Sequence, residues 1–134
     1  MELINEPHAP KVTLDSLESY YKAGYDTVRK YSSDCYVIMS NRLGDASPTE
    51  LLQFAGGLDG TVIDVHYYNL YTDDFKNMNV QQNIDYLNNK LAPHLRTLTQ
   101  SNNPLVFVGK YSLFVIMAHY LLMILIAALM VDDL

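Results

Sequence analysis

The sequence of 134 residues contains one cysteine, no tryptophan and few basic residues. A single cysteine, Cys35, excludes an internal disulfide and a zinc site built from cysteines. Nine Lys and Arg against 15 Asp and Glu give a net charge of −6. A protein that binds nucleic acid through phosphates needs a basic surface, so this class is excluded as a working hypothesis. Residues 1–5 include no basic segment and no long apolar run, so we predict no signal peptide, and the localisation stays undetermined.

The sequence also lacks a glycine-rich phosphate-binding loop, because neither GxGxxG nor GxxxxGK[ST] occurs in it. The sequence therefore has no motif that would indicate a nucleotide-binding fold, and we expect no cofactor. No metal site is predicted either. His66 with Asp73 and Asp74 could imitate one, but nothing fixes three ligands on one centre, and a solvated loop is the favoured interpretation.

Short apolar segments alternate with amphipathic ones along most of the chain. The apolar segments predict strands at Glu2–Asn5, Cys35–Met39, Thr61–His66 and Leu105–Val108. Predicted helices lie between them. The first is Leu14–Tyr31, with Thr13 as N-cap and an apolar stripe of Leu17, Tyr21, Gly24/Tyr25 and Val28 on one face. A short helix with a capping box at Ser47 and Glu50 follows, and then Val80–Thr99, with a capping box at Asn79 and Gln82 and with Pro93, which should kink it or split it in two. This order predicts an α/β fold with parallel strands, either a doubly wound open sheet or an arc of a (β/α)8 TIM barrel with about four βα units.

In both architectures, ligands bind at the C-terminal ends of the strands. The residues that follow the four predicted strands are Asn5-Glu6-Pro7, Ser40-Asn41-Arg42, His66-Tyr67-Tyr68 and Gly109-Lys110-Tyr111. These positions offer a carboxylic acid, amides, an imidazole and phenols. Such groups are suited to binding and cleaving a sugar.

These motifs resemble glycoside hydrolase family 5, the cellulase-like family, and in particular its plant glucan exo-1,3-β-glucosidase type. Asn5-Glu6-Pro7 resembles the acid/base motif at the end of barrel strand four, Val62-Ile63-Asp64-Val65-His66-Tyr67-Tyr68 resembles strand six, and Pro104-Leu105-Val106-Phe107-Val108-Gly109 resembles strand seven. The resemblance covers about residues 1–109. It implies the C-terminal half of a TIM barrel, with residues 1–110 as a partial hydrolase domain.

The resemblance implies retaining hydrolysis of β-glucan O-glycosidic bonds, for which two carboxyl groups lie roughly 5–5.5 Å apart. It implies that Glu6 is the acid/base and that Asn5 binds the 2-hydroxyl of the sugar. His66 and Tyr68 would line the same subsite, with Tyr68 orienting the nucleophile. The implied partner is β-glucan or another β-glucoside, and proteins of this family are typically secreted or in the cell wall.

The sequence departs from the family at the nucleophile. The family has Phe-Val-Gly-Glu-Trp, whereas this chain has Phe107-Val108-Gly109-Lys110-Tyr111. The ammonium of Lys110 cannot attack an anomeric carbon and has the wrong charge to stabilise an oxocarbenium-like transition state. Beside Glu6 it would also lower the pKa of that carboxyl by about 1–3 units. We therefore expect the chain to be inactive in hydrolysis on its own.

Length gives a second reason for this expectation, because a complete (β/α)8 barrel takes roughly 250 residues. We expect the counterparts of strands one to three and of strand eight to be missing. The chain also lacks tryptophan, a common platform for stacking on pyranose faces. The open edges of a partial sheet would favour self-association.

Residues 111–134 are predicted as a hydrophobic tail. Within it, residues 113–131 have one strongly polar side chain, His119, and as a helix would span about 28 Å, against a hydrocarbon core of roughly 30 Å. A transmembrane helix and a non-native tail from a frame change or retained intron both fit. The function hypotheses are accordingly a truncated, inactive glycosidase, a membrane-tethered non-catalytic protein that binds carbohydrate or a partner, and a mis-predicted gene fragment.

Overall fold

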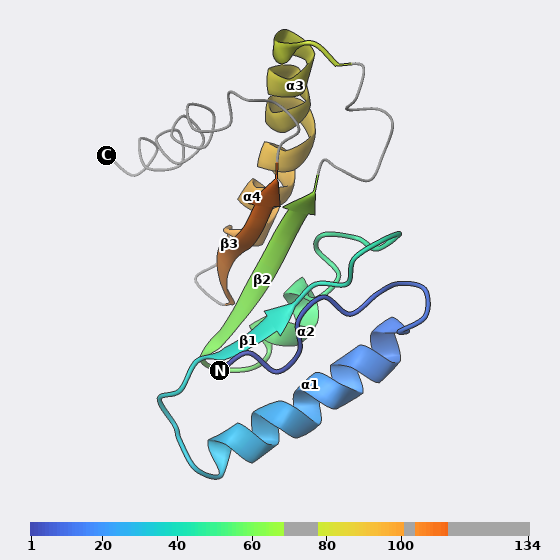
Figure 1. Ribbon diagram of the computed structural model, residues 1–134. Coiled ribbons are helices and arrows are strands. Elements are labelled where there is room, and N and C mark those ends of the chain that lie inside the picture. Colours follow the sequence, from blue (N-terminus) through green and yellow to red (C-terminus); the bar gives the residue numbers. More distant parts are fainter. Residues whose placement is uncertain (69–77, 101–103, 113–134) are drawn as a thin grey trace, which may run out of the picture.

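Three parallel strands form a single sheet in the computed structural model, which describes residues 1–68, 78–100 and 104–112 (Figure 1). The strands are β1 (Val37–Ser40), β2 (Thr61–Tyr68) and β3 (Leu105–Ser112), with β2 in the centre. Both neighbouring pairs are parallel. The prediction of an α/β fold with parallel strands is therefore confirmed.

The prediction of a first strand at Glu2–Asn5 is wrong. It makes one isolated parallel bridge, between Glu2 and Ile38. Leu3 N donates to Ile38 O at 3.3 Å, and the chain then leaves the sheet towards Glu6, whose φ is 54°. Because the chain leaves the sheet after this bridge, the described residues form three strands rather than the four predicted.

The first helix, α1 (Leu14–Arg29), matches its prediction closely. The Thr13 side chain accepts a hydrogen bond from Ser16 N at 3.3 Å, as expected of an N-cap. The predicted stripe faces the sheet, with Leu17, Tyr21 and Val28 buried. Spacings of three and four residues therefore identified the buried face correctly.

The next helix, α2 (Leu52–Gly56), begins later than predicted, and the capping box at Ser47 is wrong. The Ser47 hydroxyl accepts from Thr49 N, two residues on. The Glu50 carboxylate instead binds the guanidinium of Arg42, with 2.6 Å between Nη2 and Oε2. The ion pair thus takes up the Glu50 carboxylate that the predicted capping box would use.

The predicted third helix is divided into α3 (Val80–Tyr86), a π-helical turn η2 (Leu87–Leu91) and α4 (Ala92–Leu98). Its capping box is confirmed, because Asn79 and Gln82 each accept from the other's backbone N–H. Pro93 lies at the start of α4. Since proline has no N–H and its ring clashes with the preceding turn, the helical ladder changes register there, as predicted.

The hydrophobic core lies on one face of the sheet, where the helices pack. Its largest fully buried side chains include Tyr21, Met39, Leu51, Ile63 and Leu98. On the opposite face, the register aligns Ile38 with Val62 and Leu105, and Ser40 with Asp64 and Phe107. On this second face Leu105 is 47% and Phe107 41% exposed.

The predicted hydrophobic helix over residues 113–131 lies outside the described residues, as does most of the predicted tail 111–134. β3 runs on to Ser112, beyond the predicted strand end at Val108 and the predicted domain end at residue 110. Among the helices of the described residues, none has the length and apolarity needed to span a bilayer.

Candidate functional site

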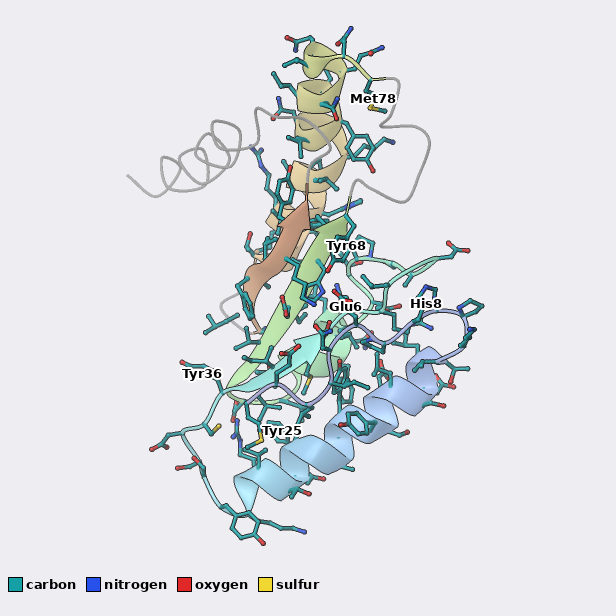
Figure 2. The ribbon with its side chains drawn as sticks, viewed as in Figure 1. Glu6, His8, Tyr25, Tyr36, Tyr68 and Met78 are labelled. Carbon is teal, nitrogen blue, oxygen red and sulfur yellow. The ribbon has the colours of Figure 1, made fainter. Side chains whose placement is uncertain are left out.

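All five predicted site residues meet at the C-terminal ends of the strands, around the carboxylate of Glu6. Its Oε1 atom lies 2.9 Å from Lys110 Nζ and 2.9 Å from His66 Nδ1, and it accepts a hydrogen bond from the Tyr68 hydroxyl. Lys110 Nζ also donates to Asn5 Oδ1 at 3.0 Å. Figure 2 shows Glu6 beside Tyr68 at the end of β2.

The backbone of Glu6 is held in a conformation that side-chain-bearing residues rarely adopt. Its φ of 54° lies in the left-handed region, which costs of order 1–3 kcal/mol for a residue other than glycine. Glu6 N donates to the Ser40 hydroxyl at 3.3 Å, and the buried hydroxyl of Tyr21 donates to Ser40 O at 2.6 Å. Tyr21 of α1 and Ser40 at the end of β1 thus hold the backbone that positions the Glu6 carboxylate.

Strand periodicity brings the other side chains to Glu6. His66 and Tyr68 are two residues apart on β2 and so face the same side of the sheet. Lys110 pairs with His66 across a register shift in β3 that leaves Gly109 unpaired. This one-residue bulge turns the Lys110 side chain towards the same face.

The ring of His66 lies between two carboxylates. Its Nδ1 contacts Glu6, and its Nε2 lies 2.9 Å from Asp64 Oδ2. The side chains of His66 and Asp64 are 2% and 6% exposed, and that of Glu6 is 23% exposed. Because a neutral imidazole has one N–H, the two contacts are both hydrogen bonds only if the three groups share at least two protons.

The neighbours of Glu6 favour its ionised form. The Tyr68 hydroxyl, then the Lys110 ammonium and the His66 ring, lower the pKa of the Glu6 carboxyl from 4.5 to about 2. The hydrogen bond to Glu6 in turn raises the pKa of Lys110. At neutral pH, Glu6 is therefore an acceptor of hydrogen bonds and not a proton donor.

Two residues of this cluster, Asp64 and Gly109, were not among the predicted site residues. Asp64 Oδ1 accepts from Gly109 N at 2.9 Å. The signal that could have found Asp64 is its charge inside the apolar run Thr61–Val65, because a buried carboxylate needs partners. The partner of that carboxylate, 45 residues away, has no local sequence signal.

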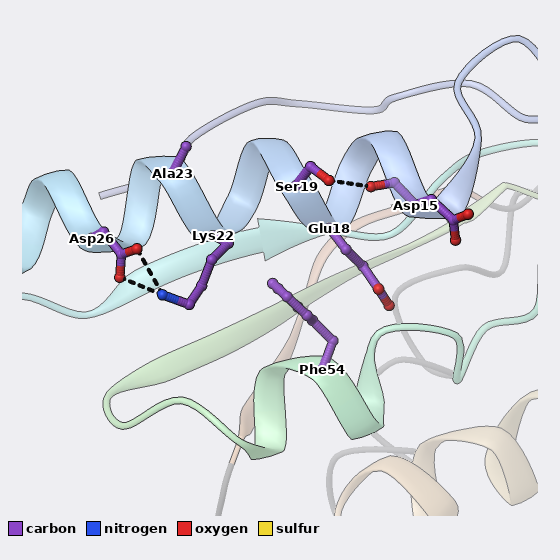
Figure 3. Close-up of a pocket in the computed structure, with 7 residues that line it drawn as sticks. All are labelled: Asp15, Glu18, Ser19, Lys22, Ala23, Asp26 and Phe54. Carbon is purple, nitrogen blue, oxygen red and sulfur yellow. Dashed lines mark hydrogen bonds and ion pairs between the residues drawn. The ribbon is translucent and has the colours of Figure 1, made fainter.

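Two further observations on the described residues lie apart from the cluster around Glu6. Within residues 1–68, 78–100 and 104–112, no group of three His, Cys, Asp or Glu side chains is arranged to hold a metal ion. Asp73 and Asp74 lie outside these residues. A groove of about 570 Å³ between α1 and Phe54 is lined by α1 side chains on the helical side of the sheet (Figure 3). It contains none of the predicted site residues.

Comparison with known proteins points to one family. The sequence model of the cellulase family (glycosyl hydrolase family 5) matches residues 1–114. The chain is 31% identical over 98 residues, 69% of its length, to the probable glucan 1,3-beta-glucosidase A of Aspergillus terreus, and covers 23% of that protein. It is 34% identical over 76 residues, 55% of its length, to the glucan 1,3-beta-glucosidase of Lachancea kluyveri, and covers 17% of it.

A third relative, the glucan 1,3-beta-glucosidase of Yarrowia lipolytica, is 27% identical over 85 residues, which are 63% of this chain and 20% of that protein. The chain thus spans about a fifth of the length of the curated relatives it matches. No solved structure gives a significant match. The particular likeness to the plant enzymes stays a prediction.

Proposed function

The chain belongs to glycosyl hydrolase family 5, and on that premise we propose that its strand-end site binds β-glucan without hydrolysing it by the retaining route. The observation that carries this proposal is the contact of 2.9 Å between Lys110 Nζ and Glu6 Oε1. It supports the loss of both carboxyl functions of a retaining glycosidase. An ammonium stands at the position of the nucleophile, and the carboxyl expected to act as the acid is held in its ionised form.

The first part of the argument concerns the acid. Protonation of a leaving oxygen requires a protonated Glu6, by the role that the family resemblance gives it. With a pKa of about 2 instead of 4.5, its protonated fraction at neutral pH falls about 300-fold. The neighbouring cation thus opposes the step that Glu6 would perform.

The second part concerns the nucleophile. The described site holds one more carboxylate, Asp64, but this side chain is 6% exposed and both of its oxygens are engaged, one by His66 and one by Gly109 N. It is therefore a poor replacement for a nucleophile, which must reach an anomeric carbon. Lys110 has no lone pair to offer while its ammonium is paired with Glu6.

The same groups remain able to bind sugar hydroxyls. Among the described residues, Oε2 of Glu6 accepts no hydrogen bond, and Lys110, with its side chain 43% exposed, uses two of its three donors on Glu6 and Asn5. Donors and acceptors are thus both present at the strand ends. The names of the relatives make a β-1,3-glucan the first ligand to test.

The test combines a hydrolysis assay with a binding assay. We expect no release of nitrophenol from p-nitrophenyl β-glucoside above buffer, and binding of laminarin-type β-1,3-glucan by calorimetry that weakens in Glu6→Gln and Asn5→Ala. Lys22→Met, which removes a cation of an exposed pair on α1, is the matched control and should bind as the parent chain does. Turnover that disappears in Glu6→Gln would refute the inactivity, and an absence of glucan binding would refute the binding role.

The partial barrel yields a related proposal. The described residues supply three parallel strands, whereas the family's barrel has eight. Lys110→Glu in the 134-residue chain should therefore not restore hydrolysis, although it returns a carboxylate to the nucleophile position. Measurable turnover by that variant would show that the described strands are sufficient.

A further inference from the structure

We infer that Asp64 is the positioning residue of this site, because its carboxylate fixes the bulge that carries Lys110 and the ring that contacts Glu6. One oxygen of Asp64 holds the backbone of β3, and the other holds His66. The inference concerns the arrangement of the site, and it rests on the proposed function only for the identity of the ligand.

The register of β2 and β3 shows why the bulge matters. Up to Val65, which pairs with Val108, the ladder is regular, and the next pair is His66 with Lys110. Without the skipped Gly109, the side chain of residue 110 would lie opposite Tyr67, on the face that packs in the core. The bulge therefore decides whether the ammonium faces Glu6 or the helices.

Asp64 is the side chain that holds this bulge. Its Oδ1 accepts the N–H of Gly109 at 2.9 Å, an N–H that the regular ladder does not use. The approach is so close that a Cβ on residue 109 would lie 2.2 Å from Oδ1 and 2.7 Å from Oδ2. Glycine is required at position 109 because the carboxylate occupies the space of a side chain.

The second oxygen of Asp64 orients His66. Asp64 Oδ2 lies 2.9 Å from His66 Nε2, and the other ring nitrogen, Nδ1, lies 2.9 Å from Oε1 of the ionised Glu6. The ring is 2% exposed, so water does not replace either partner. The buried Asp64 thus acts on Glu6 twice, once through His66 and once through Lys110.

The experiment compares four variants and uses readouts that do not need a ligand. In Asp64→Leu and in Gly109→Ala, we expect the acylation rate of Lys110, measured by mass spectrometry relative to Lys22, to change at least twofold, because the ammonium no longer contacts Glu6. The NMR titration midpoint of the Glu6 carboxyl should rise from about 2 towards 4.5. Asp64→Asn should resemble the parent chain, because its amide oxygen can accept from Gly109 N and its NH₂ can donate to His66 Nε2.

Gly57→Ala is the matched glycine control. A Cβ there would meet its nearest atom, Phe54 O, at an ordinary 3.6 Å, and φ is −83°. It should leave both readouts unchanged. Folding of each variant is checked by circular dichroism.

Folded Asp64→Leu or Gly109→Ala chains with the parent's Lys110 rate and Glu6 midpoint would overturn the inference. So would an Asp64→Asn chain that behaves like Asp64→Leu, or the unfolding of both disruptive variants, which would assign Asp64 a general structural role. Failure of every protein to bind β-1,3-glucan would instead count against the proposed function and leave the positioning role intact.

Discussion

The low pKa of Glu6 predicts that the chain loses stability in acid over a defined range. The folded-state pKa, about 2, lies below the ordinary value of 4.5. A carboxyl whose pKa is lowered by folding stabilises the native state while it is ionised in both states. Its contribution is therefore complete above about pH 5, declines as the pH falls through 4.5, and is gone near pH 2.

The size of this contribution follows from the shift and from the exposure of the site. A difference of 2.5 between the two pKa values corresponds to at most about 3 kcal/mol. The Glu6 and Lys110 side chains are 23% and 43% exposed, so solvent screens the contact. We therefore expect the ionisation of Glu6 to contribute about 1–2 kcal/mol to the free energy of unfolding. Lys110→Met removes one of the three donors to Oε1 and should therefore lower the unfolding free energy at pH 7 by only a part of this contribution.

The assay is equilibrium urea unfolding at several values of pH between 7 and 2. The parent chain should lose more stability between pH 5 and 2.5 than Glu6→Gln does, and Lys110→Met should fall between the two. Lys22→Met is the control, because its pair with Asp26 is 51% exposed on both sides and should contribute less than about 0.5 kcal/mol. Equal acid dependence in the parent chain and Glu6→Gln would refute the reasoning.

Three further variants test the contacts that support the site, each by denaturant unfolding. Tyr21→Phe removes the buried hydroxyl that binds Ser40 O and should cost about 1–2 kcal/mol; an unchanged midpoint would mean that this bond is not formed. Arg42→Met leaves the Glu50 carboxylate, 4% exposed, without its partner, and should cost about 3–5 kcal/mol, whereas a loss below 1 kcal/mol would contradict its burial. Asn79→Ala removes the α3 capping box and should cost about 1 kcal/mol with a loss of helical ellipticity, and a neutral effect would speak against the cap.

The elements that sequence predicted well are those whose signal is local. The spacing of Leu17, Tyr21 and Val28 identified the buried face of α1, and Pro93 marked the interruption before α4. The assembly of Glu6, His66 and Lys110 could also be predicted, because the carboxyl ends of parallel strands meet at one edge of a sheet. Periodicity and topology together were enough for this part.

The misses have the opposite character, because contacts outside the predicted element or an unusual backbone conformation decide them. The capping box at Ser47 lost to an ion pair between Arg42 and Glu50, and the Glu2–Asn5 strand lost to an early turn at Glu6. The bulge at Gly109 depends on a carboxylate 45 residues away. Local propensity carries no information about such partners.

The exposed apolar side chains on the second face of the sheet affect how the chain unfolds. Parallel sheets are ordinarily covered on both faces, whereas Leu105 and Phe107 already meet water in the folded state. Unfolding then exposes less new apolar surface than in a doubly covered sheet of the same length. Both the dependence of the unfolding free energy on urea concentration and the heat-capacity change of unfolding scale with that surface. We therefore expect both quantities to be smaller for this chain than for a sheet of the same length that is covered on both faces.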